Sequence, residues 1–160
     1  MILRPATQKD IPTLQRWDRE PHVISATSDD QSIEIAGDHD WADELPKQSE
    51  HSYYLIAELG GRPIGVMQII DPHLEPEHYW GDVEPNLRAL DIWIGDSQDL
   101  GKGYGDTMMR LACQVCFDDP KVTAILIDPL NSNTRSHKFY QRLGFKPVGR
   151  HTFGEDDCLV

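Results

Sequence analysis

The feature that most constrains the fold is a glycine-rich turn between an apolar strand and an amphipathic helix. Glycines stand at positions 101, 103 and 105, directly after a predicted strand over residues 86–95. Alternate glycines allow successive backbone N–H groups to converge on an anion, and the helix that follows adds the positive end of its dipole. The P-loop pattern and the dinucleotide-binding fingerprint are both absent. The sequence therefore predicts a phosphate-binding turn of another kind.

The rest of the chain alternates strands and helices, as is typical of an α/β fold. Residues 122–128 have the pattern of an apolar, buried parallel strand, residues 20–40 are polar and expected to be irregular, and residues 72–85 form a long acidic loop. We predict one α/β domain over residues 1–160, with a mixed central sheet flanked by helices. Periodicity predicts strands over 1–5, 52–59, 63–71, 86–95, 122–128 and 145–153, a last strand from 158, and helices over 8–19, 40–45, 101–119 and 133–143.

Two motifs, about 30 residues apart, resemble those of GNAT-type N-acetyltransferases. The run from Gln98 to Gly103 resembles the (R/Q)xxGxG pattern that holds the pyrophosphate of acyl-CoA in that family. The run from Asn133 through Tyr140 to Gly144-Phe145 resembles the second family motif. The resemblance implies a GNAT-like fold and acetyl-CoA as the acyl donor. The residues that it assigns to acetyl-CoA binding are Gln98, Gly101, Lys102, Gly103, Gly105 and Asn133.

Within the family, residues 79–145 are most similar to the aminoglycoside 6′-N-acetyltransferases, and the N-terminal third is similar only loosely. The resemblance implies an acetyl group moved to a primary amine and an antibiotic-resistance role. It also places Asp128 among the substrate-binding residues. Siderophore-type acyltransferases belong to the same branch, so another amine is an alternative acceptor: a hydroxylysine-type siderophore precursor, a polyamine or a protein N-terminus. A non-catalytic acyl-CoA-binding module is the alternative outside enzymes.

Acetyl transfer to an amine needs a base for the ammonium and an acid for the leaving thiolate. Alternation along the strand 86–95 places Asp91 on the face opposite Leu90 and Ile92, and we expect it to act as the base or as an anchor for the ammonium. The alternative is a surface aspartate paired with a neighbouring Arg or Lys. By resemblance, Tyr140 is the acid; the alternative is a core tyrosine. Asn133 begins the last helix, which capping alone would explain.

Acidic and basic residues are concentrated in different parts of the chain, and their distribution indicates the chemical class of the acceptor. The formal net charge is −12, which argues against nucleic acid and against an anionic membrane surface as partners. Two acidic segments, residues 28–50 and 71–99, contain eight acids and one base each, whereas residues 100–150 contain eight bases and four acids. An anionic donor fits the basic part and a cationic small-molecule amine fits the acidic segments. Aromatic residues lie among these acids at Trp41, Tyr79, Trp80 and Trp93, and the expected substrate-binding residues are Glu75, Glu77, Trp80, Trp93 and Asp128.

Other residue types give weaker indications. His73 and His78 lack metal-type spacing with other ligands, so we expect no metal site. Cys113 and Cys116 fall well inside a predicted helix, which favours packed thiols over redox chemistry. No apolar run of membrane-spanning length and no signal-peptide pattern are visible, so we expect a cytoplasmic protein. A monomer and a homodimer both remain open.

Overall fold

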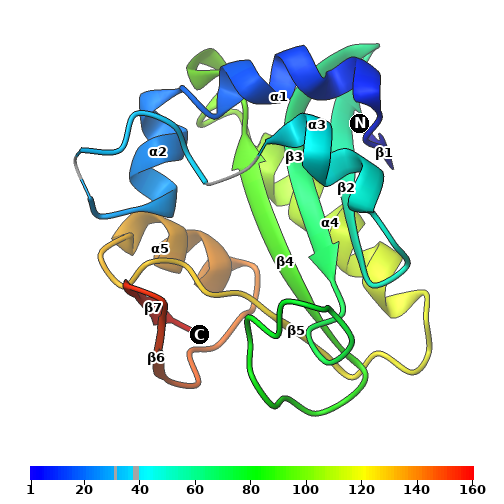
Figure 1. The fold of residues 1–160 in the computed structure, drawn as a ribbon, viewed down its shortest axis with the longest axis vertical. Helices are drawn as coiled ribbons and strands as arrows, with labels where there is room; N and C mark the ends of the chain where they lie inside the picture. The colour runs from blue at the N-terminus through cyan, green and yellow to red at the C-terminus, as the bar shows by residue number, and fades with distance from the viewer. Residues whose placement is uncertain (31, 38–39) are drawn as a thin grey trace.

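A computed structural model describes residues 1–30, 32–37 and 40–160, and Figure 1 presents the chain as a central sheet with helices on both faces. Asp38, in the first acidic segment, lies outside the described residues. The elements in chain order are β1 (Ile2–Pro5), η1 (Gln8–Asp10), α1 (Ile11–Trp17), α2 (Pro21–Thr27), α3 (Trp41–Glu44), η2 (Leu45–Lys47), β2 (Ser52–Leu59), β3 (Arg62–Ile70), β4 (Leu87–Ile94), η3 (Ser97–Asp99), α4 (Tyr104–Phe117), β5 (Ala124–Leu126), α5 (Thr134–Arg142), β6 (Arg150–Phe153) and β7 (Asp156–Leu159).

The central sheet has five strands in the order β1-β2-β3-β4-β5. The first four strands pair antiparallel, and β5 pairs parallel to β4, so the sheet is mixed as the sequence predicts. Strands β6 and β7 form a separate two-stranded sheet rather than extending the central one. The mixed sheet flanked by helices confirms the predicted fold class.

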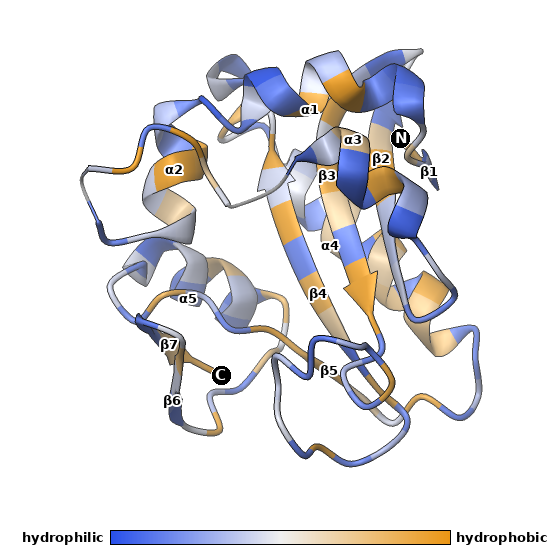
Figure 2. Cartoon of the chain, in the orientation of Figure 1, coloured by the Kyte–Doolittle hydropathy of each residue, from blue (hydrophilic) through white to orange (hydrophobic). Residues whose placement is uncertain are grey.

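Two apolar cores lie on opposite faces of the sheet. On one face, Met108, Met109 and Ala112 of α4 pack against buried residues that include Met67 and Leu90. On the other face, α1, α3 and η2 cover a second core with these buried residues: Leu14, Trp17, Trp41, Leu45, Tyr54, Ile56 and Val66. Figure 2 shows the same division, with apolar positions concentrated on the central strands and polar positions on the outer helix faces and loops.

Strands β4 and β5 separate soon after they pair. Their register joins Leu87–Ala89 to Ala124–Leu126, and β4 continues for five residues beyond this point. Along those five residues β4 pairs with β3 on one side, while α2 and α5 lie beside its other edge (Figure 1). The separation opens the sheet next to the glycine-rich turn.

The sequence predictions were wrong in four places. Residues 21–27 form helix α2 rather than an irregular segment, since Pro21 stands at its first turn and Val23 is buried. Helix α4 begins at Tyr104, because Gly101 and Gly103 have φ of 74° and 78° and belong to the turn. Strand β5 spans three exposed or half-buried residues at a sheet edge, not a buried strand over 122–128. Residues 145–149 precede strand β6 instead of forming part of it.

Candidate active site

The glycine-rich turn connects η3 to α4 through residues in the left-handed region. No atom outside the turn would touch a Cβ at Gly101 or Gly103, so their positive φ values, and not crowding, require glycine there. Gly105 lies in the first turn of α4 beside Phe139 of α5, and a Cβ there would make an ordinary contact with the Phe139 ring at 3.4 Å. The turn thus leaves free backbone at the start of a 14-residue helix, where N–H groups and the helix dipole favour an anion.

An ion-paired carboxylate holds the base of this turn. Asp99 is 1% exposed and accepts two hydrogen bonds from Arg62 of β3, at 2.6 and 3.0 Å, and one from Lys102 at 3.2 Å. The Arg62 guanidinium, assisted by Lys102, holds the pKa of Asp99 below its usual range. Asp99 therefore serves the turn itself, although it belongs to the second acidic segment.

A cavity of about 770 Å³ extends from the glycine turn along β4; we call it the glycine-turn cavity. It is lined by Gly101, Gly103 and Gly105, by three basic residues of α5 (Arg135, Lys138 and Arg142), and by Asp99 and Asp106, which are paired with Arg62 and Arg142. Helix α2 closes one side with His22, whose Nε2 donates to the carbonyl oxygen of Ile94 at 2.9 Å. The cavity thus joins backbone donors to positive charge, as an anionic ligand requires.

Of the three other residues predicted to bind the donor, one lines the glycine-turn cavity and two do not. Gln98 is exposed on η3 and Lys102 is exposed and paired with Asp99; neither is among the residues that line the glycine-turn cavity. Asn133 lines the cavity, and its side chain accepts the backbone N–H of Ser136 at 3.0 Å. The structure confirms the helix cap at Asn133.

A second cavity of about 600 Å³ shares Trp93 with the first; we call it the acidic cavity. Seven carboxylates line it, and among its described lining residues none is Lys, Arg or His. The seven are Asp18, Glu44, Glu75, Glu77, Asp91, Asp128 and Asp156. Tyr54, Tyr79, Trp80 and Trp93 supply aromatic surface between these acids. Such a wall suits an organic cation with several charges.

The two cavities meet at a small set of shared residues. Seven of the described residues line both of them: Val23, Ala26, Ile92, Trp93, Asn133, Ser136 and Tyr140. Burial and then the charges of Asp91 and Asp128 raise the pKa of Tyr140 well above its usual value. A tyrosine in this condition is protonated near neutral pH and can therefore donate a hydrogen bond or a proton to a leaving thiolate.

Asp91 lies on the face of β4 that the alternation predicts. It is opposite Gln68 in the β3–β4 register, and its neighbours Leu90 and Ile92 pack against the core under α4. The alternative pairing is contradicted, because Arg88 contacts Asp71 and Asp119 and Lys102 contacts Asp99. Burial, and then the charge of Asp128, raise the pKa of Asp91 to about 7. That value makes its carboxylate a more capable proton acceptor than an exposed aspartate.

Asp128 follows β5 and reaches the same cavity from the other strand. The hydroxyl of Tyr79 donates to its Oδ2 at 2.7 Å, and the ring of Tyr79 stacks on Phe153 of β6 with centroids 4.6 Å apart. Trp80 contacts both rings edge-on, at 5.8 and 5.1 Å. The acidic loop and the β6–β7 hairpin therefore meet over the acidic cavity.

Glu75 organises the acidic loop from inside. It is 3% exposed, and its carboxylate accepts the backbone N–H groups of Glu77 at 2.8 Å and of Tyr79 at 2.5 Å. Sequence reasoning predicts Glu75 as a substrate-binding residue. The structure assigns these loop contacts to it, while Glu77 is exposed on the cavity wall.

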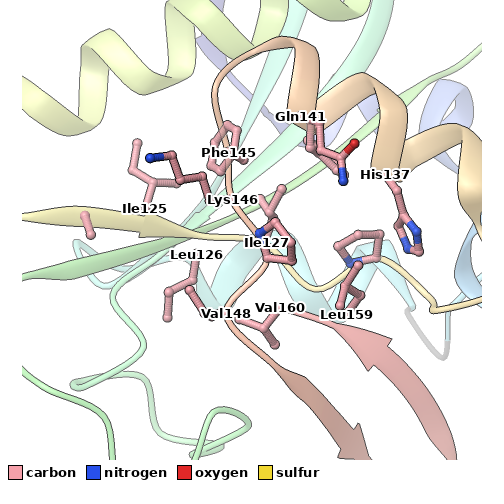
Figure 3. A pocket seen from close by; sticks show the side chains of 14 residues that line it. Ile125, Leu126, Ile127, His137, Gln141, Phe145, Lys146, Val148, Leu159 and Val160 are labelled. Atoms are coloured by element: carbon pink, nitrogen blue, oxygen red, sulfur yellow. The ribbon is translucent and has the colours of Figure 1, made fainter.

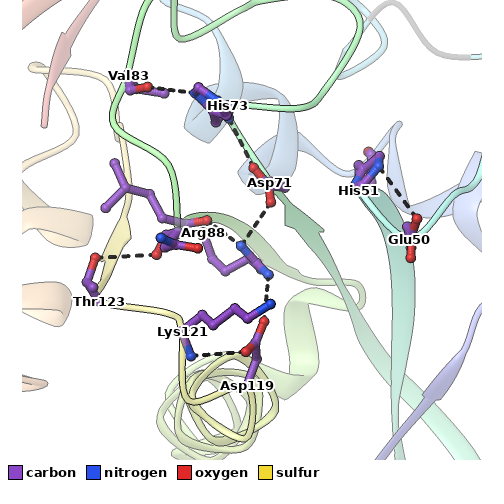
Figure 4. A network of polar contacts seen from close by, with 12 residues as sticks. Glu50, His51, Asp71, His73, Val83, Arg88, Asp119, Lys121 and Thr123 are labelled. Carbon is purple, nitrogen blue, oxygen red and sulfur yellow. Dashed lines mark hydrogen bonds and ion pairs between the residues drawn. The ribbon is translucent and has the colours of Figure 1, made fainter.

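A polar network ties both ends of the loop to the sheet (Figure 4). Arg88 of β4 donates to Asp71 at 3.0 Å and lies 3.4 Å from Asp119 at the end of α4. The backbone N–H of His73 donates to Asp71 at 3.1 Å, and Nδ1 of His73 donates to the carbonyl oxygen of Val83 at 2.9 Å. The network holds the loop that carries Tyr79 and Trp80.

A third pocket, of about 170 Å³, lies outside β5 and is shown in Figure 3. Ile125 and Leu126 of β5, Phe145, Leu159 and Val160 form its apolar wall. Tyr140 borders this pocket as well, but its lining contains none of the carboxylates that face the acidic cavity and none of the glycines of the turn. The chemistry of the site therefore belongs to the other two cavities.

Within the described residues, no group of three or more His, Cys, Asp or Glu side chains could hold a metal ion. Cys116 is buried and Cys113 is partly buried on α4, and burial raises the pKa of both thiols. Helices of the described part of the chain are all too short or too polar to cross a membrane.

This arrangement, a glycine turn at the open edge of β4 joined to a second cavity, is that of an acyl-CoA-dependent acetyltransferase. The chain matches the family described as acetyltransferase (GNAT) domain over residues 6–153. The protein belongs to the GNAT acetyltransferases, for which acetyl-CoA is the donor.

Characterised relatives cover almost the whole chain. Aminoglycoside N(6′)-acetyltransferase type 1 of Klebsiella pneumoniae is 29% identical over 155 residues, which cover 95% of this chain and 77% of the relative. Lysine N-acyltransferase MbtK of Mycobacterium tuberculosis is 25% identical over 152 residues, covering 93% and 70%. The structure of AAC(6′)-Ib with coenzyme A and kanamycin matches with a TM-score of 0.81 at 27% identity, covering 98% of this chain and 90% of that one.

Sequence reasoning missed helix α2 with His22, and the contact between Tyr79 and Asp128. Pro21 was a usable signal for the helix, because proline is favoured in the first turn of a helix. The Tyr79 contact joins residues 49 positions apart and leaves no local pattern.

Proposed function

We propose that this acetyltransferase acts on a primary amine of a polycationic amino-sugar, and that the acceptor is the 6′-amine of an aminoglycoside. The observation that carries the proposal is the acidic cavity, with seven carboxylates and no described basic residue in its lining. The named relative from K. pneumoniae and the kanamycin complex of AAC(6′)-Ib support the same acceptor class.

The reaction follows from the groups where the two cavities meet. Asp91 accepts a proton from the substrate ammonium, directly or through water, and Asp128 holds the positive charge nearby. The free amine forms a C–N bond with the thioester carbon. The open edge of β4 beyond Ala89 offers backbone N–H groups to the developing oxyanion.

Collapse of the intermediate breaks the C–S bond. Tyr140 gives its proton to the leaving thiolate and recovers one from the nitrogen of the new amide. The sum is an amide, free coenzyme A and one proton, which Asp91 releases to water. Each of these roles is part of the proposal.

A thiol-release screen with acetyl-CoA tests the acceptor class. Kanamycin, ribostamycin, spermidine and lysine would be compared at equal concentration, and the acetylated position of the product read by NMR. We expect the highest kcat/KM with an aminoglycoside, modified at its 6′-amine. A preference for lysine would instead favour the activity named for MbtK, and a preference for spermidine would favour a polyamine.

The carboxylate wall can be tested separately. The double substitution Glu44→Gln and Glu77→Gln removes two charges from the acidic cavity without touching the glycine turn. We expect KM for the aminoglycoside to rise about tenfold while KM for acetyl-CoA stays constant. Equal rises in both KM values would contradict an acceptor role for this wall. Exposed Asp82 and Glu84 lie outside the lining, so the pair Asp82→Asn and Glu84→Gln is the matched control for lost charge.

A further inference from the structure

The two carboxylates at the centre of the acidic cavity have unequal surroundings. Asp128 accepts the hydroxyl hydrogen of Tyr79 at 2.7 Å, whereas among the described residues no side chain donates to Asp91. Both carboxylates line one cavity, and they act on each other, since the charge of Asp128 raises the pKa of Asp91. Two carboxyl groups that interact in this way share protons unless another contact favours the anion of one of them.

We infer that Tyr79 is a positioning residue that makes this pair unequal: its hydroxyl keeps Asp128 as the anion and leaves Asp91 as the group that accepts the proton. The inference rests on the proposed function only where it says that Asp91 accepts the proton of the substrate amine. The division of protons between them is a property of the free enzyme.

The hydroxyl of Tyr79 is held for this contact by three other interactions. Its backbone N–H donates to Glu75, its ring stacks on Phe153, and Trp80 packs edge-on against it. Glu75 is buried, and the loop that carries Glu75, Tyr79 and Trp80 is tied to β4 by Arg88 and Asp71. Tyr79 therefore reaches Asp128 from a braced position on the loop.

The hydrogen bond lowers the pKa of Asp128, although burial, the larger effect, raises it. A backbone N–H at Asp128 also lowers this pKa, and Asp156 raises it. Burial raises the pKa of Cys158 to about 12 and that of Tyr140 further, so neither changes charge near neutral pH. Within the part of the chain that the structure describes, five ionisable groups face Asp128: Tyr79 from the loop, Asp91 from β4, Tyr140 from α5, and Asp156 and Cys158 from β7. Burial, and to a smaller extent the charge of Asp29, raise the pKa of both Asp156 and Cys158.

Carboxyl-carbon NMR of the free enzyme between pH 4 and 9 tests the inference without any substrate. In the wild type, we expect Asp128 to titrate in the lower step and Asp91 alone in the upper step. Tyr79→Phe keeps the ring for the Phe153 stack but removes the donor, so both carboxyls should move in the upper step. That step should shift upward by up to about one pH unit, the scale of a hydrogen bond to a charged group. An upper step carried by Asp128 in the wild type, or unchanged in Tyr79→Phe, overturns the inference.

Two further variants separate the hydroxyl from the fold. Phe153→Leu removes one of the three contacts that hold Tyr79 and keeps its hydroxyl, its bond to Glu75 and its contact with Trp80, so the wild-type order of titration should persist. A change equal to that of Tyr79→Phe would assign the effect to packing of the loop and refute a specific role for the hydroxyl. Tyr53→Phe removes a hydroxyl on the other face of the sheet, beside the α4 core, and should leave both steps in place.

The kinetic counterpart is the acid limb of kcat/KM for whichever amine the enzyme turns over. In Tyr79→Phe this limb should move upward with the NMR step, which lowers activity up to about tenfold near pH 6.5 and restores it above pH 8.5. A loss that is equal at every pH would indicate structural damage and overturn the inference. If aminoglycosides fail as acceptors, the proposed function fails while the NMR result still decides the role of Tyr79.

Discussion

Replacing Asp91 with asparagine should make the protein more stable at pH 8 while it slows the reaction. The side chain is partly buried in the wall of the acidic cavity, and burial together with the charge of Asp128 raises its pKa from 3.8 to about 7. Because that pKa exceeds the value in the unfolded chain, this group stabilises the fold fully only below about pH 4. The contribution is lost as the pH rises to 7.

The size of the effect follows from the same pKa. Holding the carboxylate ionised at pH 8 costs about 4 kcal/mol, at about 1.4 kcal/mol for each pH unit. Water in the cavity screens part of this, so we expect Asp91→Asn to gain about 2–4 kcal/mol in the free energy of unfolding at pH 8. At pH 5, where the wild-type carboxyl is largely protonated, the gain should fall by more than half.

Urea unfolding at pH 5 and pH 8 measures this difference. Asp82→Asn is the matched control, because Asp82 is exposed on the acidic loop and its loss changes the net charge equally. The reasoning is refuted if Asp91→Asn is less stable than the wild type at pH 8, or if its gain is the same at both pH values. Turnover of the same variant should fall about 10²-fold, the usual scale for a lost general base.

Three other predictions concern the donor side and the acid. Tyr140→Phe should lower kcat roughly 10²-fold with a melting temperature close to that of the wild type, and unchanged turnover would remove Tyr140 from the mechanism. Gly103→Ala forces a side chain onto a residue with φ of 78° and should cost about 1–2 kcal/mol and weaken coenzyme A binding by calorimetry. Gly60→Ala, at φ of 58° in the β2–β3 hairpin, should cost about as much stability but leave that binding intact. Acetyl-CoA at 100 times its Kd should stabilise the fold by about 2.7 kcal/mol, seen as a higher Tm, and no rise at millimolar ligand would contradict donor binding.

Local sequence patterns predicted the framework of the site. Alternation along residues 86–95 placed Asp91 and Leu90 on opposite faces of β4, and the structure agrees. The alternate glycines predicted a turn with exposed backbone before the helix, and Gly101 and Gly103 form this turn with positive φ. The position of Asn133 before an amphipathic run predicted the cap that it forms with Ser136. Each of these depends on residues within one turn of helix or a few strand positions, so the sequence alone determines them.

The electrostatics of the site depended on contacts that no local pattern encodes. Of the carboxylates in the second acidic segment, Asp99 pairs with Arg62 and Asp71 with Arg88, while Asp91 faces the cavity without such a base. Composition predicted an acidic region, but it could not tell which acids form ion pairs that stabilise the fold and which face the cavity. Only folding brings Tyr79 to Asp128, 49 residues away, and only folding buries Asp91 beside Asp128 and so raises its pKa. The chemistry of a carboxylate depends on its solvent exposure and its neighbours, and the tertiary structure decides both.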